Sequence, residues 1–338
     1  MTEQRILFTA PGVAELVERE CKPLKPDRVR VRLAYSTISS GTERARLTGD
    51  PNIDWRTEKD PPVVFPRCAG YCSAGTVVEI GSEVKDVAVG DRVALMGGHH
   101  GTYVAIDHND VFPIGDTPFE EAATWYIALF PLAAIRKCRV ELGESALVMG
   151  QGVLGMMATR LLRAVGAVPI IAADPVPEKR EKALSLGADH ALDPFTPDFA
   201  QQVKALSGGG ANVCIEVTGN GQALDGALDC MARFGRVALL GCTRSSDFTI
   251  DYYRKIHAPG ITLIGAHNGA RPQSESHAGW WTHRDDMAAL LRLYQAGRLQ
   301  FADMVEEVHS PAEAPAVYAR LAAGKSFPLV QFDWGLLP

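Results

Sequence analysis

The 338-residue sequence lacks the features that direct a chain to a membrane or to nucleic acid. No apolar stretch reaches the roughly 18 to 20 residues that span a bilayer, and the start, MTEQRILFTAPG, lacks the basic and apolar regions of a signal peptide. The net charge is −6, and no run of Lys and Arg is present to neutralise phosphates. We therefore expect a cytoplasmic protein that acts on a small molecule, with neither nucleic acid nor membrane as a partner.

The sequence also lacks the paired cysteines of a disulfide framework. Its seven cysteines are odd in number and scattered, and several lie in apolar runs. Cysteines in such settings are usually reduced and packed in the interior. We expect free thiols at Cys21, Cys68, Cys72, Cys138, Cys214, Cys230 and Cys242.

What the sequence does contain is a glycine-rich turn between apolar segments. The run Ala146 to Met149 is followed by Gly150, Gly152 and Gly155 in a G-x-G-x-x-G pattern, and a segment with helical periodicity comes next. The first glycine permits a tight turn, the second lets backbone N–H groups approach a pyrophosphate, and the third allows close packing of helix on strand. Because strand, turn and helix occur together, we interpret the stretch as a dinucleotide-binding motif rather than a merely structural turn.

An acidic residue, Asp174, ends the next apolar run, about 20 residues beyond the glycines. Its carboxylate can bond ribose hydroxyls and repels a 2′-phosphate, so NAD is favoured over NADP, although Lys179 and Arg180 lie nearby. The residues expected to contact the cofactor lie in the turn, around Asp174 and at the ends of later strands. They are Gly150, Gln151, Gly152, Val153, Leu154, Gly155, Asp174, Lys179, Val217, Thr218, Gly241, Cys242 and Ala266.

The periodicity of the chain changes twice along its length. Up to Thr117, short runs with period two are broken by Gly, Pro and Asp, which is typical of an antiparallel, barrel-like unit, and Gly41 to Pro66 is expected to be an irregular surface loop. From 123 to 268, strands alternate with helices, which predicts a doubly wound parallel sheet. Residues 269–338 are too few for a core of their own, so the expected domains are 1–122 with 269–338, and 123–268.

The full length of the chain carries motifs in a specific order and spacing. They are YSTISSGTE (35–43), AGYCSAGTVVEIG (69–81), VGDRV (89–93), EEAA (120–123), GQGVLG (150–155) and LGADH (186–190). In this order they resemble the medium-chain dehydrogenase/reductase superfamily, of the alcohol, sorbitol and threonine dehydrogenase type. The resemblance implies a GroES-like antiparallel β-barrel-like catalytic domain, a Rossmann domain, a nicotinamide cofactor in the cleft, and a homodimer or homotetramer.

The positions that hold the catalytic zinc in this family carry other residues here. By motif, Ser40 replaces the first cysteine ligand, Tyr71 the histidine and Cys72 the glutamate after it, while Tyr126 falls at the third ligand. Serine and tyrosine hydroxyls are not zinc ligands at neutral pH, so we expect no metal. The four cysteines of the family's structural zinc are also missing. A rearranged metal site is the weaker alternative to packed thiols and an entrance-lining histidine, and it would use Cys68, Cys72, His99 and His100.

Without zinc, hydroxyl groups must stabilise the alkoxide that develops during hydride transfer. Ser40, Tyr71 and Tyr126 are the candidates, and Thr42 matches a family hydroxyl that bonds the substrate oxygen. A tyrosine or serine O–H can serve as an oxyanion donor and proton relay, and the alternative for each tyrosine is that it fills the volume the metal vacated. Glu43 matches an acid behind the family's metal ligands and is expected to orient Ser40, Arg44 or a tyrosine rather than to perform chemistry.

His267 and Asn268 follow the last Rossmann strand, where the family's backbone meets the nicotinamide carboxamide. His267 is therefore a candidate acid or base and Asn268 a candidate substrate contact, with an incidental surface histidine as the alternative. His99 and His100 share that ambiguity. His100 is also a candidate substrate contact. The remaining candidates are tryptophans, which either stack on a sugar or planar ligand or simply pack, and they are Trp125, Trp280 and Trp281, with Trp55 as a further aromatic.

These features predict a zinc-independent, NAD(H)-dependent oxidoreductase that interconverts a secondary alcohol and its ketone. A polyol, a sugar or an aromatic-containing compound is the expected substrate. One alternative is an NADPH-dependent enoyl or quinone reductase acting on an activated C=C bond, but such members of the superfamily usually lack an acid at the position of Asp174. The other alternative is a cofactor-binding paralogue that lost catalysis with its zinc.

Overall fold

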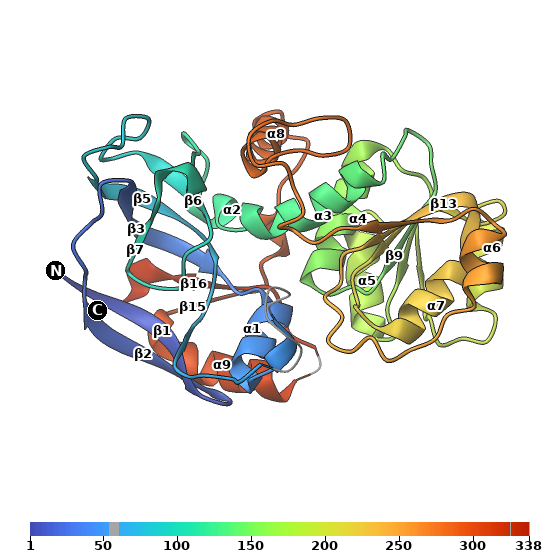
Figure 1. Ribbon diagram of the computed structural model, residues 1–338, viewed down its shortest axis with the longest axis horizontal. Helices are drawn as coiled ribbons and strands as arrows, with labels where there is room; N and C mark the ends of the chain where they lie inside the picture. Colours follow the sequence, from blue (N-terminus) through green and yellow to red (C-terminus); the bar gives the residue numbers. More distant parts are fainter. Residues whose placement is uncertain (54–60, 325, 338) are drawn as a thin grey trace. The chain divides into compact units, whose positions relative to one another are not determined.

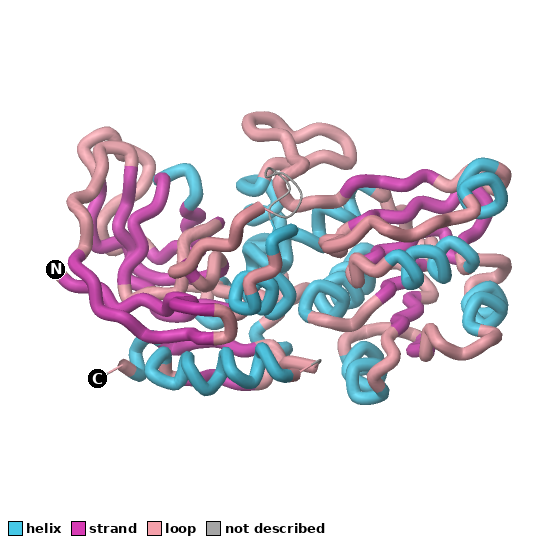
Figure 2. Tube along the Cα trace, turned by 60° about the horizontal axis from the view of Figure 1, so that its bottom comes forward, coloured by secondary structure: helices cyan, strands magenta, loops and turns pink. Residues whose placement is uncertain are grey.

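A computed structural model of the protein describes residues 1–53, 61–324 and 326–337. The chain divides into two compact units, residues 1–127 with 300–338 and residues 128–299. Strands dominate the first unit, whereas strands and helices alternate along the second (Figures 1 and 2). Trp55 lies outside the described residues.

The first unit is a predominantly antiparallel β structure, as the period-two runs predict. Its central strand, β3 (Arg28–Thr37), points Val29, Val31 and Leu33 into the core. The larger sheet has the order β15 (Glu307–His309), β16 (Val330–Asp333), β3, β5 (Cys72–Ile80), β6 (Arg92–Met96), β8 (Val111–Pro113), with β7 (Tyr103–Asp107) also paired to β3. A smaller sheet has the order β2 (Val13–Glu20), β1 (Thr2–Ala10), β4 (Arg67–Cys68).

The C-terminal segment completes this unit. Strand β16 pairs antiparallel with β3, and helix α9 (Ala314–Ala323) packs beside it. Tyr318 and Phe332 are fully buried in one core with Phe8 of β1 and Val31 of β3. Residues from the two ends of the chain therefore share one hydrophobic interior.

Helix α1 (Ser40–Thr48) corrects the expectation of an irregular loop from Gly41 onward. The Glu43 carboxylate accepts a hydrogen bond from the Ser39 N–H at 2.7 Å, which satisfies one backbone donor at the start of the helix. Leu47 is fully buried, and Gly49 ends the helix in the left-handed conformation, with φ of 78°. The sequence did not predict this short helix, because the glycine and the charged residues of SGTERARLT obscure its single buried stripe.

The second unit contains the predicted Rossmann sheet, and all of its strands are parallel. The order is β11 (His190–Leu192), β10 (Ile170–Ala173), β9 (Ala146–Met149), β12 (Ala211–Glu216), β13 (Met231–Leu239), β14 (Thr262–Gly265). This is the strand order of a doubly wound dinucleotide-binding fold, whose direction reverses between β9 and β12. Ligands bind such sheets at the carboxyl ends of the strands near that reversal.

Helices cover the sheet because its strands are apolar on both faces. Leu147 and Met149 of β9 pack in one core with residues of α6 (Phe199–Leu206) and α7 (Gly221–Asp229). Ala146 and Val148, which alternate with them, are also fully buried and point to the opposite face. Helices α4 (Val153–Val165) and α5 (Pro177–Ser185) follow β9 and β10 along the chain (Figure 1).

Residues 269–299 belong to the second unit, which differs from the expected boundary at 269. The segment contains helix α8 (His283–Gln295), and Asp286 of this helix forms an ion pair with Arg136 of α3 (Trp125–Lys137) at 2.6 Å. Residues 123–127 lie in the first unit, next to α2 (Phe119–Ala122). This ion pair joins residues 150 positions apart, and neither sequence periodicity nor length reveals such pairing.

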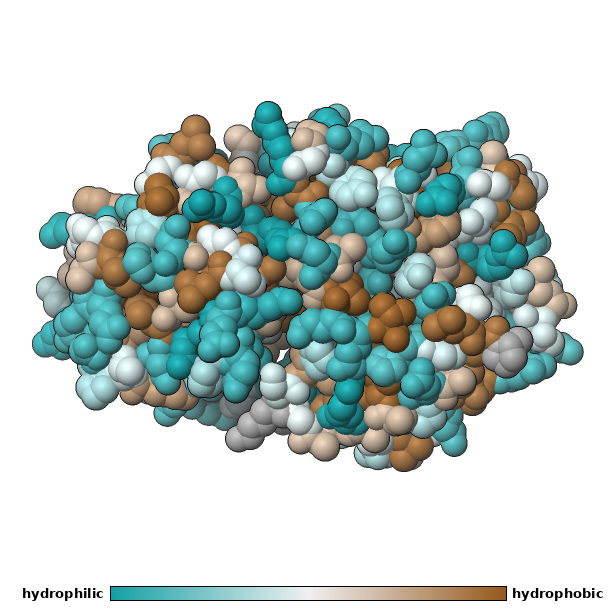
Figure 3. All heavy atoms as spheres, turned by 180° about the vertical axis from the view of Figure 1, so that it is seen from behind, coloured by the Kyte–Doolittle hydropathy of each residue, from teal (hydrophilic) through white to brown (hydrophobic). Residues whose placement is uncertain are grey.

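The surface mixes polar and apolar side chains. On the face shown in Figure 3, hydrophobic residues are interspersed among hydrophilic ones. Within the described ranges, no helix combines the length and apolar character needed to cross a membrane.

Candidate functional site

The glycine turn lies directly after β9. Gly150 has a φ of 94°, and a Cβ at Gly155 would stand 1.9 Å from the Gly150 carbonyl oxygen, so glycine is required for this close packing. A Cβ at Gly152 would meet no described atom within 4 Å, which leaves space beside the first turn of α4, begun by Val153 and Leu154. The backbone N–H groups there are available to an anionic phosphate.

Asp174 stands at the carboxyl end of β10, next to this turn. Its carboxylate accepts hydrogen bonds from the Gln151 N–H at 2.7 Å and the Val176 N–H at 2.9 Å, and the residue is 5% exposed. Lys179 Nζ lies 3.9 Å from the same carboxylate. The arrangement fixes an acceptor at the edge of the sheet where the sequence predicts ribose binding.

A buried carboxylate that the sequence analysis did not single out organises the end of β12. Glu216 accepts hydrogen bonds from the Thr218 N–H at 2.7 Å, the Gly219 N–H at 3.1 Å and the Thr218 hydroxyl. Burial raises the pKa of Glu216. One signal was available, because VCIEV places a single charge in an otherwise apolar strand.

The other predicted cofactor residues lie at the same carboxyl edge. A Cβ on Gly150 would stand 2.8 Å from the Thr218 side chain, and one on Gly241 would stand 2.2 Å from the Gly219 nitrogen, so these loops touch. Val217 also contacts the glycine turn, Cys242 is exposed, and Ala266 is buried behind β14. This collection fits a dinucleotide, and the individual cofactor contacts stay predictions.

His267 and Asn268 follow β14 at this edge. His267 is exposed, and its Nδ1 accepts a hydrogen bond from the Gly269 N–H at 3.1 Å. Asn268 is 8% exposed, and its carbonyl oxygen accepts from Arg271 Nε at 3.1 Å. The exposed imidazole keeps an acid–base role chemically feasible for His267, whereas Asn268 lies mostly inside.

In the first unit, the hydroxyl group of Tyr71 is the centre of a polar cluster. It donates a hydrogen bond to Ser39 Oγ and also bonds the Thr42 side chain. Burial raises the pKa of Tyr71, so the phenol keeps its proton at neutral pH. A neutral O–H held beside other hydroxyls can donate to a developing alkoxide.

The other two predicted hydroxyl residues lie nearby. Tyr126 meets Tyr71 edge to face, with ring centroids 5.8 Å apart. Ser40 begins α1, but the serine whose hydroxyl bonds Tyr71 is its neighbour Ser39. Motif alignment gives the position in sequence, whereas the direction of each side chain at a helix start decides which serine faces Tyr71.

Glu43 holds this cluster from behind. It is fully buried, and besides the Ser39 N–H it accepts hydrogen bonds from Tyr318 Oη at 2.5 Å and His100 Nε2 at 3.1 Å. Three donors surround the carboxylate, which is the environment a buried anion needs. Glu43 therefore orients its neighbours, as the resemblance implies.

His100 is part of the same interior network. The residue is fully buried, and its Nδ1 lies 2.7 Å from Ser36 Oγ, which also accepts from Trp334 Nε1 at 2.8 Å. With both ring nitrogens engaged by Ser36 and Glu43, the imidazole serves the network. This burial speaks against the predicted contact of His100 with substrate.

The residues at the family's zinc position fit a zinc ion poorly. Cys72 is buried, its Sγ donates to the Ala123 carbonyl oxygen at 2.9 Å, and burial raises its pKa to about 12. The rearranged set is divided among other partners, since Cys68 meets Arg5 and His100 is engaged as above. Within the described part of the chain, no cluster of three or more His, Cys, Asp and Glu is placed to hold an ion.

The candidate tryptophans are engaged by the protein itself. Trp125 is 1% exposed and donates from Nε1 to Glu121 at 2.9 Å, which places it in the interior, against the predicted substrate contact. Trp280 and Trp281 are half-buried, and cations from α3 cover one face of each ring, Lys137 Nζ at 4.6 Å and Arg136 Cζ at 3.5 Å from the respective centroids.

Comparisons with known proteins agree with this fold. The family described as zinc-binding dehydrogenase matches residues 153–281. D-guloside 3-dehydrogenase of Escherichia coli (strain K12) is 27% identical over 334 residues, covering 93% of this chain and 95% of the relative. L-threonine 3-dehydrogenase of Pyrococcus horikoshii is 28% identical over 297 residues, covering 77% of this chain and 81% of the relative.

A solved structure shares the whole architecture. Benzyl alcohol dehydrogenase from Acinetobacter calcoaceticus superposes with a TM-score of 0.84 and 21% sequence identity, covering 98% of this chain and 99% of that one. At this identity the likeness shows the fold alone. The matching family, the curated relatives and the fold thus make the chain similar to medium-chain, zinc-binding dehydrogenases, and the relatives named here are oxidoreductases.

Proposed function

We propose that the protein interconverts a secondary alcohol and its ketone with NAD(H), without a catalytic metal. The observation that carries this proposal is the Tyr71 hydroxyl, bonded to Ser39 and Thr42 at the place where the family holds zinc. A dehydrogenase needs a hydride carrier and a group that stabilises the substrate oxygen. The second unit supplies a site suited to the carrier, and the first supplies the hydroxyl groups.

The carboxyl edge of the Rossmann sheet supports the cofactor assignment. The turn at Gly150 to Gly155 leaves backbone N–H groups at the start of α4 for the pyrophosphate, and Asp174 is held by two backbone N–H groups in position for a ribose. When bound, a nicotinamide dinucleotide accepts or delivers the hydride. The negative charge of Asp174 favours NAD over NADP.

The hydroxyl cluster supports proton handling without zinc. In the direction of ketone reduction, Tyr71 Oη donates a hydrogen bond to the carbonyl oxygen and then its proton to the alkoxide. The hydroxyls of Ser39 and Thr42 stand within hydrogen-bond contact to return a proton to Tyr71. Glu43 fixes the Ser39 main chain and takes no direct part.

The substrate class rests on the relatives. The names of the two curated relatives describe dehydrogenation at position 3 of D-guloside and of L-threonine, and both positions carry secondary hydroxyls. A sugar or polyol is therefore the first class to test, ahead of aromatic alcohols. The expected partner is this small molecule, and a homodimer or homotetramer stays a prediction from the resemblance.

The experiment is a panel of secondary alcohols and their ketones read at the NADH absorbance, with protein whose zinc content has been measured. We expect turnover of at least one sugar or polyol by protein that holds less than about 0.1 zinc per chain. If turnover appears only after zinc is added and scales with bound zinc, the metal-free assignment is wrong.

A specific observation favours the second candidate, an NADPH-dependent enoyl or quinone reductase. Lys179 lies 3.9 Å from Asp174, and Arg180 donates to the Asp174 carbonyl oxygen at 2.8 Å, so two cations stand where a 2′-phosphate would need them. Parallel titrations with NADH and NADPH separate the candidates, since tighter NADPH binding supports the second. Binding of either cofactor without turnover of any substrate supports a paralogue without catalysis.

A further inference from the structure

The chain segment Ala266–Asn268 occupies a defined place in the Rossmann unit. It follows β14, and β12, β13 and β14 form the half of the sheet beyond the reversal of strand order. Each half of such a sheet binds one mononucleotide of a dinucleotide. Because the glycine turn and Asp174 belong to the adenosine half, Ala266–Asn268 belongs to the half that takes the nicotinamide.

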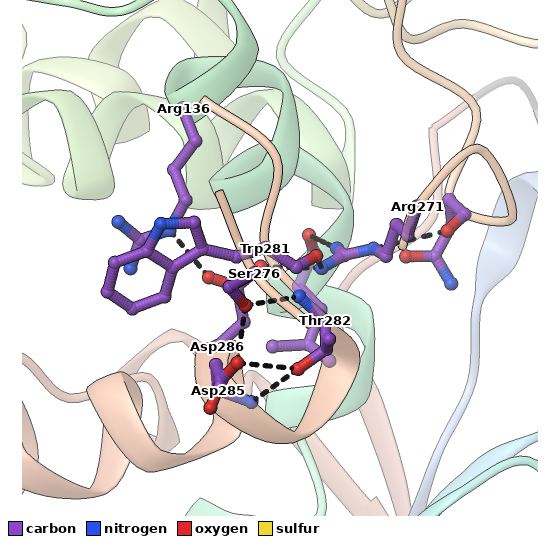
Figure 4. A network of polar contacts seen from close by, with 9 residues as sticks. Arg136, Arg271, Ser276, Trp281, Thr282, Asp285 and Asp286 are labelled. Atoms are coloured by element: carbon purple, nitrogen blue, oxygen red, sulfur yellow. Dashed lines mark hydrogen bonds and ion pairs between the residues drawn. The ribbon is translucent and has the colours of Figure 1, made fainter. Parts of the chain in front are cut away.

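A buried arginine holds one end of this segment. Arg271 donates from Nε to the Asn268 carbonyl oxygen at 3.1 Å, from NH1 to Asp286 at 2.5 Å, and from NH2 to the Leu129 carbonyl oxygen. Its side chain is 1% exposed. The guanidinium fork thus ties the main chain after β14 to α3 and α8 at once (Figure 4).

Asp286 is shared between two arginines. Its second oxygen accepts from Arg136 Nε at 2.6 Å, and the Arg136 guanidinium also stacks on Trp281, 3.5 Å from the ring centroid. The Asp286 side chain is fully buried. Figure 4 shows these side chains converging from α3, α8 and the connecting loop.

The start of α8 is locked in a way that fixes Asp286. Thr282 caps the helix by accepting from the Asp285 N–H at 3.1 Å, and its hydroxyl donates to the Asp285 carboxylate at 2.9 Å. Ser276 Oγ accepts from the Thr282 N–H at 2.9 Å and donates to Asp285. These bonds therefore hold the first turn of α8, which carries Asp286, in one conformation.

A second cation holds the other end of the segment. Lys137 Nζ donates to the Gly265 carbonyl oxygen at 3.2 Å and lies over the Trp280 ring, and burial with the nearby Arg271 charge lowers its pKa to about 8. The carbonyl groups of Gly265 and Asn268 are thus both held by side chains. These two bonds tether the main chain on both sides of Ala266 and His267.

We propose that Arg271, supported by Asp286 and Arg136, is a positioning residue for the nicotinamide half of the cofactor. A buried arginine and a buried aspartate, joined by the half-buried Arg136, are costly to desolvate and are a poor choice for stability alone, whereas they set the geometry of the main chain they bond. Holding the Ala266–Asn268 backbone before the cofactor arrives lowers the ordering cost of binding. This inference rests on the proposed NAD(H) binding.

The test compares NADH with ADP-ribose, which keeps the adenosine half and lacks nicotinamide. Arg271→Met removes the bond to Asn268 but leaves Asp286 paired with Arg136, so no buried carboxylate is left alone. We expect NADH to bind about tenfold more weakly to this variant, while ADP-ribose affinity stays within about twofold. Isothermal titration measures both dissociation constants.

Two further variants make the comparison decisive. Arg271→Lys keeps the charge opposite Asp286 but lacks the fork, so NADH affinity should be intermediate, and it replaces Arg271→Met if that variant does not fold. Arg163→Met removes a largely exposed ion pair to Asp189 in the same unit and should change neither affinity. An unchanged ratio of the two affinities in both Arg271 variants would overturn the inference.

The titrations distinguish a failure of the proposed function from a failure of the positioning role of Arg271. If wild-type protein binds neither NADH nor NADPH, the proposed function fails and the positioning role falls with it. If the wild type binds NADH and the Arg271 variants lose NADH and ADP-ribose affinity in equal proportion, Arg271 supports the fold in general and the positioning role is wrong.

Discussion

Two regions of the molecule are built in different ways. One is the carboxyl edge of the Rossmann sheet with the turn Gly150 to Gly155, called here the dinucleotide edge, and the other is the hydroxyl cluster around Tyr71 in the first unit. The dinucleotide edge is made from main chain, and its shape depends on residues that lack side chains, such as Gly155, whose Cβ would collide with a carbonyl oxygen at 1.9 Å. The hydroxyl cluster around Tyr71 depends on side chains. Tyr71 donates to Ser39 Oγ, and Glu43 behind it accepts from the side chains of His100 and Tyr318. One site is specified locally, and the other is assembled across the chain.

This difference predicts how each region responds to substitution. A backbone site fails when any Cβ intrudes, whatever the chemistry of the new residue. A side-chain site fails when a donor or acceptor is lost, even if the shape is kept. An added Cβ atom should therefore impair the first region, and a lost donor or acceptor the second.

The largest effect is expected from Gly155→Ala. The new methyl group would overlap the Gly150 carbonyl oxygen, so the turn must open, and we expect NADH affinity to fall by more than about 100-fold. Gly226→Ala is the matched control, because a Cβ there meets no described atom within 4 Å and its helix tolerates alanine. Titration of both variants with NADH checks the pair, and equal affinities would contradict a backbone-built site.

Tyr71→Phe keeps the ring and removes the hydroxyl. We expect kcat to fall about 100-fold, with NADH affinity unchanged, because the lost group is the one proposed to donate to the substrate oxygen and not to the cofactor. Ser39→Ala should lower kcat more than Ser40→Ala does, since Ser39 bonds Tyr71. Steady-state kinetics on the substrate found in the alcohol panel measures all three, and full activity of Tyr71→Phe removes Tyr71 from the mechanism.

Glu43→Gln should weaken the first unit. The amide keeps one acceptor oxygen, and its NH2 group must then face either the Ser39 N–H or the donors of His100 and Tyr318, so we expect a loss of about 2 to 4 kcal/mol in the free energy of unfolding. Glu18→Gln, on the exposed face of β2, is the control and should stay within about 0.5 kcal/mol. Denaturant unfolding compares them, and equal stabilities would show that the network does not depend on the charge.

The smallest effect concerns His99. Burial, and then the charge of Arg5, lowers its pKa to about 3 from 6.5, so the folded state binds fewer protons than the unfolded state between these values. Stability due to His99 is therefore present above pH 6.5 and is lost as the pH falls toward 3, by at most about 1.4 kcal/mol per pH unit for one proton. His99→Gln should flatten this dependence in unfolding curves measured from pH 7 to pH 4, and an unaltered slope would contradict a neutral His99.

The two regions also differ in how much of them the sequence predicts. The Rossmann sheet, the turn at Gly150 and the place of Asp174 follow from local patterns, because strand, turn and helix are short-range features. The bond from Tyr71 to Ser39 rather than Ser40 depends on where α1 begins, which the sequence did not show. Tyr318 reaches Glu43 across 275 positions of the chain, a contact that no local pattern encodes.

Contacts between residues remote in the chain also explain two other differences between the sequence predictions and the structure. His100 reads as an entrance histidine in the sequence but is buried, because Ser36 and Trp334 complete a network around it. The sequence predicts that residues 269–299 belong to the catalytic domain, yet they lie in the second unit, where Asp286 pairs with Arg136. Such pairings arise from the folded arrangement and not from periodicity.

The central claim is that hydroxyl groups do the work of zinc. Its most direct test is to measure turnover and bound zinc on the same purified sample, before and after treatment with a chelator and after adding zinc. We predict that turnover of the sugar or polyol substrate with NAD is unaffected by chelation and is not raised by zinc, and that Tyr71→Phe lowers it about 100-fold under the same conditions. Activity that disappears on chelation and returns in proportion to added zinc would contradict the claim.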